Sequence, residues 1–425
     1  MTMAEIAAGL RNREGAVITD CRLRTADSPS AGTSPGVRAG VPARYEQRGP
    51  RCEPCGLYVH VPLCRSKCRY CGFYSVPAAG QDAGRLVRAI LRELEGYDGA
   101  EFQTAYVGGG SPTALPAGEL IELVRRVRRR CREGAEFTVE CNPGQVGPEL
   151  LARLREAGVN RLSFGAQSFR AAELELLGRG HSVEQIGLSV EMARRAGFDN
   201  LGLDLISAIP GSTLADWQAS VEAAIGLNVE HVSAYSLSFE AGTVFEDWRQ
   251  AGRLVPVDEE LDRAMYEWAI DRLEGAGLRQ YEISNFARAG RECRHNLGYW
   301  ENRPFVGVGP GAASYWRRGR TANEADIERY VEAVESGRPA PGECRAASAE
   351  EVACETAVLN LRMRAGIDLA EFKRRTGFDA MAIFAEPIRR YTELGLIEVA
   401  AGAVRLTRRA LPIADTVLCD FAFLD

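Results

Sequence analysis

The sequence predicts an α/β protein, an incomplete (β/α)6 barrel followed by a small α+β module at the C-terminal end. Three observations predict this fold class. Apolar runs alternate with amphipathic stretches of helical period from Tyr58 to Leu237, polar residues recur where successive runs end, and helices followed by one hairpin replace the alternation after about Ala346. Repeated β–α units form a parallel sheet with right-handed crossovers. Six such units suggest a partial barrel, in which side chains at the carboxyl ends of the strands converge on one site.

The first part of the chain does not fit this pattern. Residues 1–50 are rich in Gly, Ala, Ser, Pro and Arg and show no sustained apolar period, so we expect a disordered N-terminal extension. They also lack the apolar core of a secretory signal. Cys52 and Cys55 follow as a C-x2-C pair, which can be a redox pair, half of a second metal site or two incidental cysteines.

Composition favours a cytoplasmic protein. Twelve cysteines in 425 residues are too few for a disulfide scaffold, and no apolar stretch approaches the roughly 20 residues of a membrane span. The net charge of −6 gives no general attraction to phosphate backbones, and we interpret the arginine-rich run 125–132 as the solvated face of a helix. We therefore expect neither an integral membrane segment nor a nucleic-acid partner.

Three cysteines follow the first apolar run of the barrel. Cys64, Cys68 and Cys71 lie within eight residues at C-x3-C-x2-C spacing, directly after Leu57–Val61. A strand that leads into such a loop can place three thiolates on one iron–sulfur cluster and leave one iron without a protein ligand. An open metal position is typical of a chemical site. A zinc site with four thiolates is the alternative, although the tight triplet lacks the paired C-x2-C spacing of most zinc sites.

The remaining barrel elements follow in order. Buried parallel strands are predicted for the apolar runs Thr104–Val107, Phe137–Glu140, Arg161–Gly165, Leu201–Leu205 and His231–Leu237. Helices are predicted for the amphipathic stretches Gly84–Glu95, Gly118–Arg130, Gly147–Ala157 and Ser182–Ala196. We place the barrel at residues 56–290 and a connecting segment at 291–345.

The C-terminal module is predicted at residues 346–425. Three helices are expected at Val352–Met363, Leu369–Thr376 and Ala380–Leu394, and a hairpin at 395–407 turns at its central Ala-Gly. Helices followed by a hairpin resemble a winged-helix module. Such folds often bind DNA, but no basic recognition helix is evident, so we expect a packing or lid role.

Polar residues stand at the predicted carboxyl ends of the barrel strands. The Gly-rich turn 108–113 follows the strand ending at Val107, and consecutive glycines let backbone amides approach a bound group closely. Glu140, Gln167 and Asp204 each end one of the next three strands. Any one of them can be a helix cap or a turn residue. Together, at one rim of a barrel beside a cysteine loop, they predict a binding site.

From about Gly56 to its end, the chain resembles the oxygen-independent coproporphyrinogen III oxidase-like branch of the radical S-adenosylmethionine (SAM) superfamily. The resemblance implies a radical SAM barrel that binds one [4Fe–4S] cluster and SAM. It rests on the cysteine triplet and seven further segments: Tyr58–Pro62, Gly108–Thr113, Glu140–Gly144, Arg161–Phe169, Leu177–His181, Ile209–Thr213 and Tyr281–Phe286.

Within this branch the chain is more similar to HemW, regarded as a heme chaperone, than to the dehydrogenase. The dehydrogenase has a fourth cysteine two positions after the third, where this chain has Phe73. Residues 294–300 match the H-N-x-x-Y-W motif typical of HemW. The resemblance implies that His295 binds heme with support from Asn296, Tyr299 and Trp300, since imidazole can ligate heme iron. From the residues alone, His295 can equally belong to a core hydrogen-bond network.

Carried over position by position, the resemblance assigns cofactor contacts but no catalytic residue. Cys64, Cys68 and Cys71 would be the metal ligands, and His295 the heme contact. The SAM site would include Tyr58, Tyr70, Gly109, Gly110, Ser111, Glu140, Gln167, Arg179 and Asp204.

Two functions from different classes remain open. The favoured one is a HemW-like heme chaperone that binds the cluster, SAM and heme and delivers heme to an acceptor protein. The alternative is an enzyme, a coproporphyrinogen III dehydrogenase acting on a porphyrinogen. An electron donor is a further partner if SAM is cleaved. Opening of the heme ring is a third hypothesis, but no residue of the sequence favours it over the other two.

Overall fold

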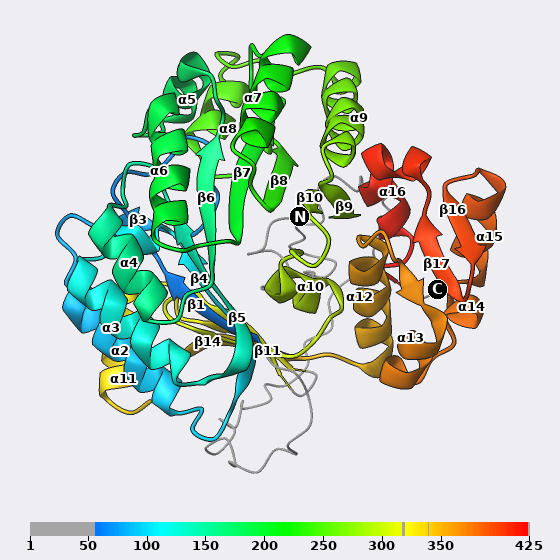
Figure 1. Cartoon of the computed structure of the whole chain (residues 1–425). Coiled ribbons are helices and arrows are strands. Elements are labelled where there is room, and N and C mark those ends of the chain that lie inside the picture. The colour runs from blue at the N-terminus through cyan, green and yellow to red at the C-terminus, as the bar shows by residue number, and fades with distance from the viewer. Residues whose placement is uncertain (1–55, 317–318, 339, 424–425) are drawn as a thin grey trace.

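The computed structural model describes residues 56–316, 319–338 and 340–423 (Figure 1). The expected extension at 1–50 and the pair Cys52 and Cys55 lie outside the described residues. Among the described helices, none is long and apolar enough to cross a membrane.

One curved sheet organises the larger part of the molecule. It has the strand order β14-β13-β12-β11-β1-β4-β5-β6-β7-β8-β10-β9. Six parallel strands at its centre carry the six predicted β–α units, and the sheet stays open between β14 and β9. The incomplete α/β barrel is therefore confirmed. The central strands are β1 (Gly56–Val61), β4 (Phe102–Gly109), β5 (Cys131–Cys141), β6 (Arg161–Gln167), β7 (Leu201–Ser207) and β8 (His231–Ser236).

The two faces of the sheet differ in chemistry because side chains alternate along a strand. In β1, Leu57, Val59 and Val61 are fully buried in the main hydrophobic core, which the surrounding helices complete. Tyr58 and His60 have the opposite parity and face the lumen. The apolar runs thus build the outer core, and the residues between them supply a polar interior.

Helices cover the outer face of the sheet, as Figure 1 shows. The four predicted helices are confirmed with ends that differ by up to two residues. Several begin with a side-chain cap, such as the capping box of Thr213 and Asp216. The barrel helices are α2 (Ala83–Glu95), α3 (Ala117–Arg128), α4 (Pro148–Glu156), α5 (Ala171–Leu177), α6 (Val183–Arg195), α7 (Leu214–Gly226), α8 (Val244–Gln250) and α9 (Glu259–Gly275).

Residues 291–345 do more than connect two parts of the chain. They add four strands to the sheet, with β11 parallel to β1 and the others antiparallel. No long apolar run marks these short strands, so their pairing with β1 decides their structure. They are β11 (Phe305–Val308), β12 (Ala313–Trp316), β13 (Gly319–Asn323) and β14 (Pro341–Ala346), while β9 (Arg279–Glu282) and β10 (Asn285–Ala287) extend the other edge.

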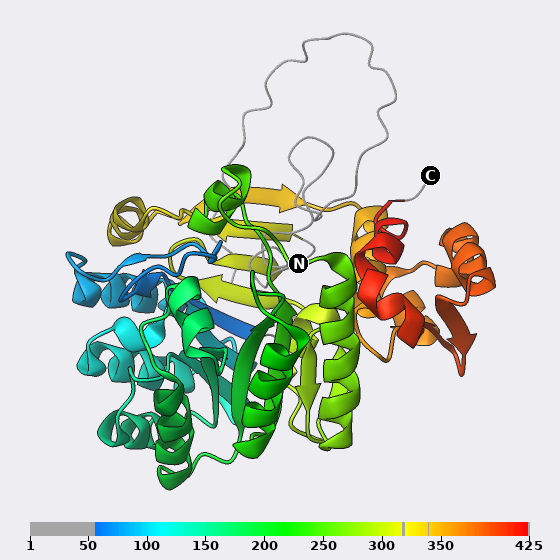
Figure 2. The same cartoon turned by 90° about the horizontal axis from the view of Figure 1, so that it is seen from above.

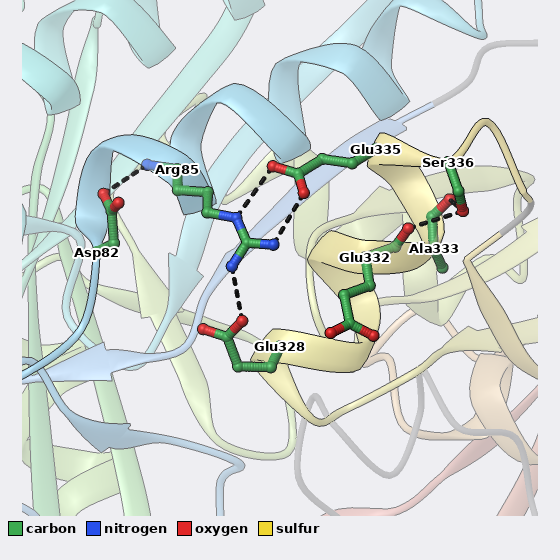
Figure 3. A network of polar contacts seen from close by, with 7 residues as sticks. All are labelled: Asp82, Arg85, Glu328, Glu332, Ala333, Glu335 and Ser336. Carbon is green, nitrogen blue, oxygen red and sulfur yellow. Dashed lines mark hydrogen bonds and ion pairs between the residues drawn. The ribbon is translucent and has the colours of Figure 1, made fainter.

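This extension is fastened to the barrel through α11 (Ile327–Glu335), which lies beside α2. Arg85 of α2 donates to Glu328 at 2.7 Å and to both carboxylate oxygens of Glu335 at 2.8 and 3.0 Å (Figure 3). In the interior, Glu93 of α2 accepts hydrogen bonds from Asn323 and from the Tyr330 hydroxyl. The two contacts hold β13 and α11 against the first barrel helix.

The C-terminal module consists of helices and a three-stranded sheet of order β15-β17-β16. The predicted hairpin is confirmed, and its turn residues Ala401 and Gly402 both have positive φ. The helix predicted at Ala380–Leu394 is divided in two at Phe384, because Pro387 has no N–H to continue the bonding and its ring excludes the carbonyl of Ile383. The elements are α12 (Ala349–Leu361), β15 (Ile367–Asp368), α13 (Leu369–Thr376), α14 (Ala380–Ile383), α15 (Ala385–Glu393), β16 (Ile397–Ala400), β17 (Ala403–Leu406), η2 (Arg408–Ile413) and α16 (Ala414–Cys419).

The module packs against the barrel beside α9, as seen from above in Figure 2. Arg408 of η2 pairs with Asp271 of α9 at 2.7 Å. The Ile283 amide donates to the Arg362 carbonyl at 3.1 Å, and the Arg364 amide donates to the Tyr281 carbonyl at 3.0 Å. Backbone pairing therefore joins the β9–β10 turn to the end of α12.

Candidate functional site

The cysteine loop is closed at its base by a small parallel sheet. Strands β2 (Leu63–Cys64) and β3 (Val76–Pro77) pair with each other, so the loop leaves and returns at one point beside β1. The Val76 amide donates to the Pro62 carbonyl, and the Ala78 amide to the Cys64 carbonyl, both at 2.8 Å. Cys64, Cys68 and Cys71 are thereby held on one short loop next to the carboxyl end of the first barrel strand.

Arg69 fastens the far side of the loop. Its amide donates to the Leu177 carbonyl, and its guanidinium donates to the carbonyls of Glu175 and Leu176 at 2.7 and 3.0 Å. The same guanidinium lies over the ring of Trp248, 5.5 Å from its centre. The cysteine loop is therefore bound to α5 and α8 through Arg69, which is not among the predicted site residues.

The three cysteines are free and half-buried. Burial raises the pKa of Cys71 to about 11 and also raises the pKa of Cys64, so both thiols are protonated at neutral pH without a metal. A bound metal would displace these protons. Within the described ranges, no three His, Cys, Asp or Glu side chains converge on a single ion. In a cubane cluster each thiolate binds a different iron, so its ligands need not converge in that way.

Arg179 links the loop to the strand ends. Its Nη1 donates to Cys68 Sγ at 3.4 Å, while Nη2 donates to Asn142 Oδ1 and the Gly165 carbonyl at 2.5 and 2.7 Å. Its Nε is enclosed and has no hydrogen-bond partner in the described structure. A buried donor without a partner costs free energy, so this cation is suited to receive a carboxylate.

Gln167 and Asp204 lie near this guanidinium. Gln167 ends β6 with φ of +67°, a conformation unusual for a residue other than glycine. Its amide nitrogen and the Arg179 guanidinium both pack against Gly165, where a Cβ would lie 2.8 and 3.2 Å from them. Asp204 accepts from the Ser163 hydroxyl at 3.3 Å. Burial raises the pKa of the Asp204 carboxyl, although the hydrogen bond from Ser233 and the charge of Arg161 oppose this effect.

Glu140 occupies the neighbouring strand end and is held by two donors. The Tyr106 hydroxyl donates to Oε1 at 2.7 Å and the Gly109 amide donates to Oε2 at 3.1 Å. Burial raises the pKa of Glu140 to about 7, and the Tyr106 hydrogen bond limits the rise. Tyr106, Glu140 and Asp204 retain partial exposure inside the barrel, so solvent reaches the lumen from this end.

The backbone amides of the Gly-rich turn are engaged within the protein. The amides of Gly109, Gly110 and Ser111 are occupied by Glu140, the Val61 carbonyl and the Leu63 carbonyl. A Cβ on Gly110 would lie 2.7 Å from the Leu63 oxygen, and one on Gly109 would meet the His60 ring at 2.6 Å. Glycine is required here so that the turn can approach β1 and β2, and these amides are not free for a ligand.

The two tyrosines predicted for the site have different surroundings. The Tyr58 hydroxyl hydrogen-bonds with His60 Nδ1 at 2.9 Å, and its ring lies 6.3 Å from that of Tyr106. Tyr70, within the cysteine loop, packs on Phe245 of α8 with ring centres 6.4 Å apart. Burial raises the pKa of both phenols, so each stays neutral at physiological pH.

His295 lies at the opposite end of the barrel. It is near Gly56 and Thr104, at the amino ends of β1 and β4, about 13 Å along β4 from Gly108. It is only 3% exposed, and Asn296, Tyr299 and Trp300 are also buried. Its Nδ1 bonds with Thr104 Oγ1 at 2.8 Å and its Nε2 with the Tyr299 hydroxyl at 2.9 Å.

Both ring nitrogens of His295 are therefore engaged, which departs from the expectation of an available heme ligand. Burial lowers the pKa of His295 to about 3 and keeps the ring neutral. A cavity of about 230 Å³ adjoins the motif, and His295, Thr104 and Tyr299 are among its lining residues, together with Gln103, Arg294 and Arg303. It is smaller than the roughly 300–1,000 Å³ of pockets for drug-sized ligands, and a heme is larger still.

Several residues of the site were missed from the sequence, and most share one signal. Tyr106 pairs with Thr138, two residues before Glu140, and Ser163 pairs with Glu140 itself, so both face the lumen as Glu140 does. Arg161 is 1% exposed in the same interior and leaves its Nε without a partner in the described structure. Reading each strand for polar residues at alternate positions would have found them.

Models of protein families match two parts of the chain. The radical SAM superfamily model matches residues 58–224, and the model of the HemN C-terminal domain matches residues 347–413. The first range contains the cysteine loop and every strand end described above. A radical SAM domain implies a [4Fe–4S] cluster and SAM, and the three thiols with the unpartnered Arg179 Nε are donors that fit these groups.

Individual proteins are similar over nearly the whole described chain. Heme chaperone HemW of Bacillus subtilis is 36% identical over 372 residues, which cover 86% of this chain and 98% of that protein. Heme chaperone HemW of Mycobacterium tuberculosis is 34% identical, with 86% and 94% covered. The structure of Escherichia coli coproporphyrinogen III oxidase (HemN), a radical SAM enzyme, has a TM-score of 0.77 at 21% identity and covers 89% of this chain and 91% of its own. The last similarity shows the fold alone.

Proposed function

Because the chain belongs to the HemW family of radical SAM proteins, we propose that it is a heme chaperone that binds heme and transfers it to an acceptor protein. The observation that carries this proposal is the similarity to the Bacillus subtilis heme chaperone, which extends over 98% of that relative. Phe73, at the position where the dehydrogenase has its fourth cysteine, also favours a chaperone.

We assign the cluster to the cysteine loop. Cys64, Cys68 and Cys71 would each bind one iron, and the fourth iron would remain open. Arg179 donates to Cys68 Sγ, and such a contact would stabilise the negative charge of a thiolate. The β2–β3 pairing and Arg69 hold the loop in place before any metal arrives.

SAM would lie between this loop and the strand ends. The cluster, when bound, would offer its open iron to SAM. Arg179 would bind a carboxylate through its free Nε, while Glu140, Gln167 and Asp204 would accept from or donate to the polar groups of the ligand. Tyr58 and Tyr70 line the same region, and the turn 109–111 shapes its wall.

Three partners follow from this proposal: heme, a heme-acceptor protein, and an electron donor if SAM is cleaved. Residues of the H-N-x-x-Y-W motif are buried in this structure, so they do not offer an iron ligand without rearrangement. The proposed location is the cytoplasm, where thiols stay reduced. The alternative function, oxidative decarboxylation of coproporphyrinogen III, is favoured by the fold similarity to HemN alone.

One experiment separates the two functions. The anaerobically reconstituted protein is incubated with SAM, a reductant and either coproporphyrinogen III or heme. We expect a stable heme complex with a Soret band, transfer of that heme to an apo-hemoprotein, and no tetrapyrrole product. Formation of protoporphyrinogen would instead establish the dehydrogenase and overturn the chaperone assignment. The Cys68→Ala variant is the control for cluster-dependent turnover.

A further inference from the structure

The H-N-x-x-Y-W motif is built into the interior of the protein from its first residue. Glu136 of β5, itself 6% exposed, accepts from the backbone amides of Arg294 and His295 at 3.0 Å each. These amides belong to the first turn of α10 (Arg294–Trp300), where a carboxylate is favoured. The barrel wall thus fixes both the start of the helix and the direction of the His295 side chain.

Neither ring nitrogen of His295 has a lone pair available to bind iron. A neutral imidazole has one N–H donor and one acceptor nitrogen. Thr104 engages Nδ1 and Tyr299 engages Nε2, so in either tautomer the acceptor nitrogen already receives a hydroxyl proton. Iron ligation would require breaking that bond in a position that is 3% exposed.

The ring supports a tyrosine that reaches the candidate SAM site. His295 stacks on Tyr106 with ring centres 5.2 Å apart and planes 26° apart. The Tyr106 hydroxyl, at the other end of that ring, donates to Glu140 Oε1 at 2.7 Å. One side chain therefore separates the motif from a carboxylate at the strand ends.

The other side of α10 contacts the C-terminal module. Asn360 Nδ2 of α12 donates to the Trp300 carbonyl at 2.8 Å, and the Arg362 guanidinium lies 4.7 Å from the centre of the Trp300 ring. Asn302, just after the helix, donates from Nδ2 to Thr356 Oγ1 at 3.0 Å. The motif is thus packed between the barrel lumen and α12.

We propose that the H-N-x-x-Y-W motif is a positioning element, in which His295 fixes Tyr106 and thereby orients the Glu140 carboxylate, and that it does not supply the heme ligand. The part concerning Glu140 rests on the proposed SAM site. The part concerning heme rests on the hydrogen bonds that Thr104 and Tyr299 make with the two ring nitrogens of His295. One unit of contacting side chains then spans the lumen, from His295 through Tyr106 to Glu140.

Two substitutions test the unit, each in the full chain reconstituted anaerobically. His295→Gln keeps polar atoms for Thr104 and Tyr299 but removes the flat ring under Tyr106 and the imidazole that could bind iron. Tyr106→Phe keeps a ring on His295 but removes the hydrogen bond to Glu140. SAM affinity, cluster absorbance and the Soret band during a hemin titration are measured for both variants and for the double variant.

We expect SAM to bind roughly ten-fold more weakly to each single variant, the size expected when a hydrogen bond to a charged group is lost. The double variant should lose no more than either single variant, because residues acting through one contact are not additive. The cluster absorbance should be retained, and His295→Gln should keep the heme affinity and Soret maximum of the unsubstituted protein.

Three results would overturn the inference. A lost or shifted Soret band in His295→Gln, with SAM affinity unchanged, would make the histidine a heme ligand. Independent, additive losses of SAM affinity would remove the link through Tyr106. If His295→Gln fails to assemble a cluster, an unchanged SAM affinity in Tyr106→Phe still rejects the positioning role. If the unsubstituted protein binds no heme, the chaperone proposal fails while the SAM comparison continues to test the unit.

Discussion

Arg179 is the residue on which the proposed SAM site most depends. It contacts Cys68, Asn142 and the Gly165 carbonyl, yet its Nε has no partner in the described structure. Losing a charged hydrogen-bond partner in a partly desolvated site costs about 1.5–3 kcal/mol, or roughly ten- to a hundred-fold in affinity. Calorimetry should therefore show SAM binding weakened by that factor in Arg179→Ala, and also in Asp204→Ala.

A matched arginine serves as the control for this prediction. Arg195 lies on the outer surface of α6, with its side chain 78% exposed and paired with Glu191 of the same helix. Arg195→Ala removes the same charge and should leave SAM affinity unchanged. Unaltered affinity in both Arg179→Ala and Asp204→Ala would mean that SAM binds elsewhere.

The cysteine loop gives a second prediction at the residue scale. Alanine at any one of Cys64, Cys68 and Cys71 should abolish the visible absorbance of the reconstituted cluster, because the loop has three cysteines and the cluster needs all three thiolates. Cys131 and Cys141 are also free thiols, but they belong to β5 rather than to the loop. Cys131→Ala and Cys141→Ala should keep the absorbance, and an intact cluster in Cys68→Ala would reject the ligand assignment.

At the scale of elements, the junction between α12 and the β9–β10 turn contains a buried ion pair. Glu282 is fully buried and lies 3.9 Å from Arg362, which is 5% exposed and also covers Trp300. Removing one partner of a buried pair leaves the other charge uncompensated and costs about 3–5 kcal/mol. Arg362→Ala should lower the free energy of unfolding by that amount in urea titrations.

The surface pair of Arg389 and Glu393 on α15 is the control for the junction. Both side chains are more than 60% exposed, so Arg389→Ala should change stability by less than about 0.5 kcal/mol. The double variant Glu282→Gln, Arg362→Met removes both charges and should recover most of the loss. Equal effects of Arg362→Ala and Arg389→Ala would show that the buried pair does not hold the module.

For the whole molecule, the histidines predict how stability depends on pH. Burial is the main cause that lowers the pKa of every histidine in the chain, so the folded protein keeps them neutral at pH values where the unfolded chain protonates them. The pKa falls to about 4 for His60 and His181, to about 3 for His295, and well below its usual value for His231.

The direction of this pH dependence follows from how many protons the folded and unfolded states bind. A lowered histidine pKa contributes stability that is present above the unfolded pKa of about 6.5 and is lost as the pH falls below it. Glu93 and Glu140 act in the opposite direction, because burial raises their pKa to about 7 and the folded state takes up their protons first. Burial also raises the pKa of Glu173, Asp204, Asp262 and Glu282, which oppose the histidines at lower pH. Stability should therefore decrease as the histidines of the unfolded chain titrate below about pH 6.5, and less steeply toward pH 4.5.

Thermal unfolding of the cluster-free chain across this range measures the effect. The unfolding temperature should be lower at about pH 5 than at about pH 7. Each histidine can lower the free energy of unfolding by up to roughly 1.4 kcal/mol per pH unit. His181→Gln removes one titrating group and should make the decline shallower. A midpoint that is level or rises toward acid pH would show that carboxyl protonation dominates.

The sequence by itself determined the features that depend on local spacing. The alternation of apolar runs and helical periods predicted all five later barrel strands and four of the barrel helices, because those patterns record which face of each element is buried. The cysteine triplet on one loop needs no distant contact to be recognised. Glu140, Gln167 and Asp204 were found because parallel strands end at one edge.

The tertiary structure decided what depends on partners far away in the chain. Strands β11–β14 carry no strong local pattern and form because β11 pairs with β1, about 250 residues earlier. The amides of the Gly-rich turn are occupied by Glu140 and by carbonyls of another strand. His295 looks like an available ligand in sequence, but Thr104 and Tyr299 hydrogen-bond with its two ring nitrogens. A motif shows which groups are present, and only packing decides which of their atoms remain free.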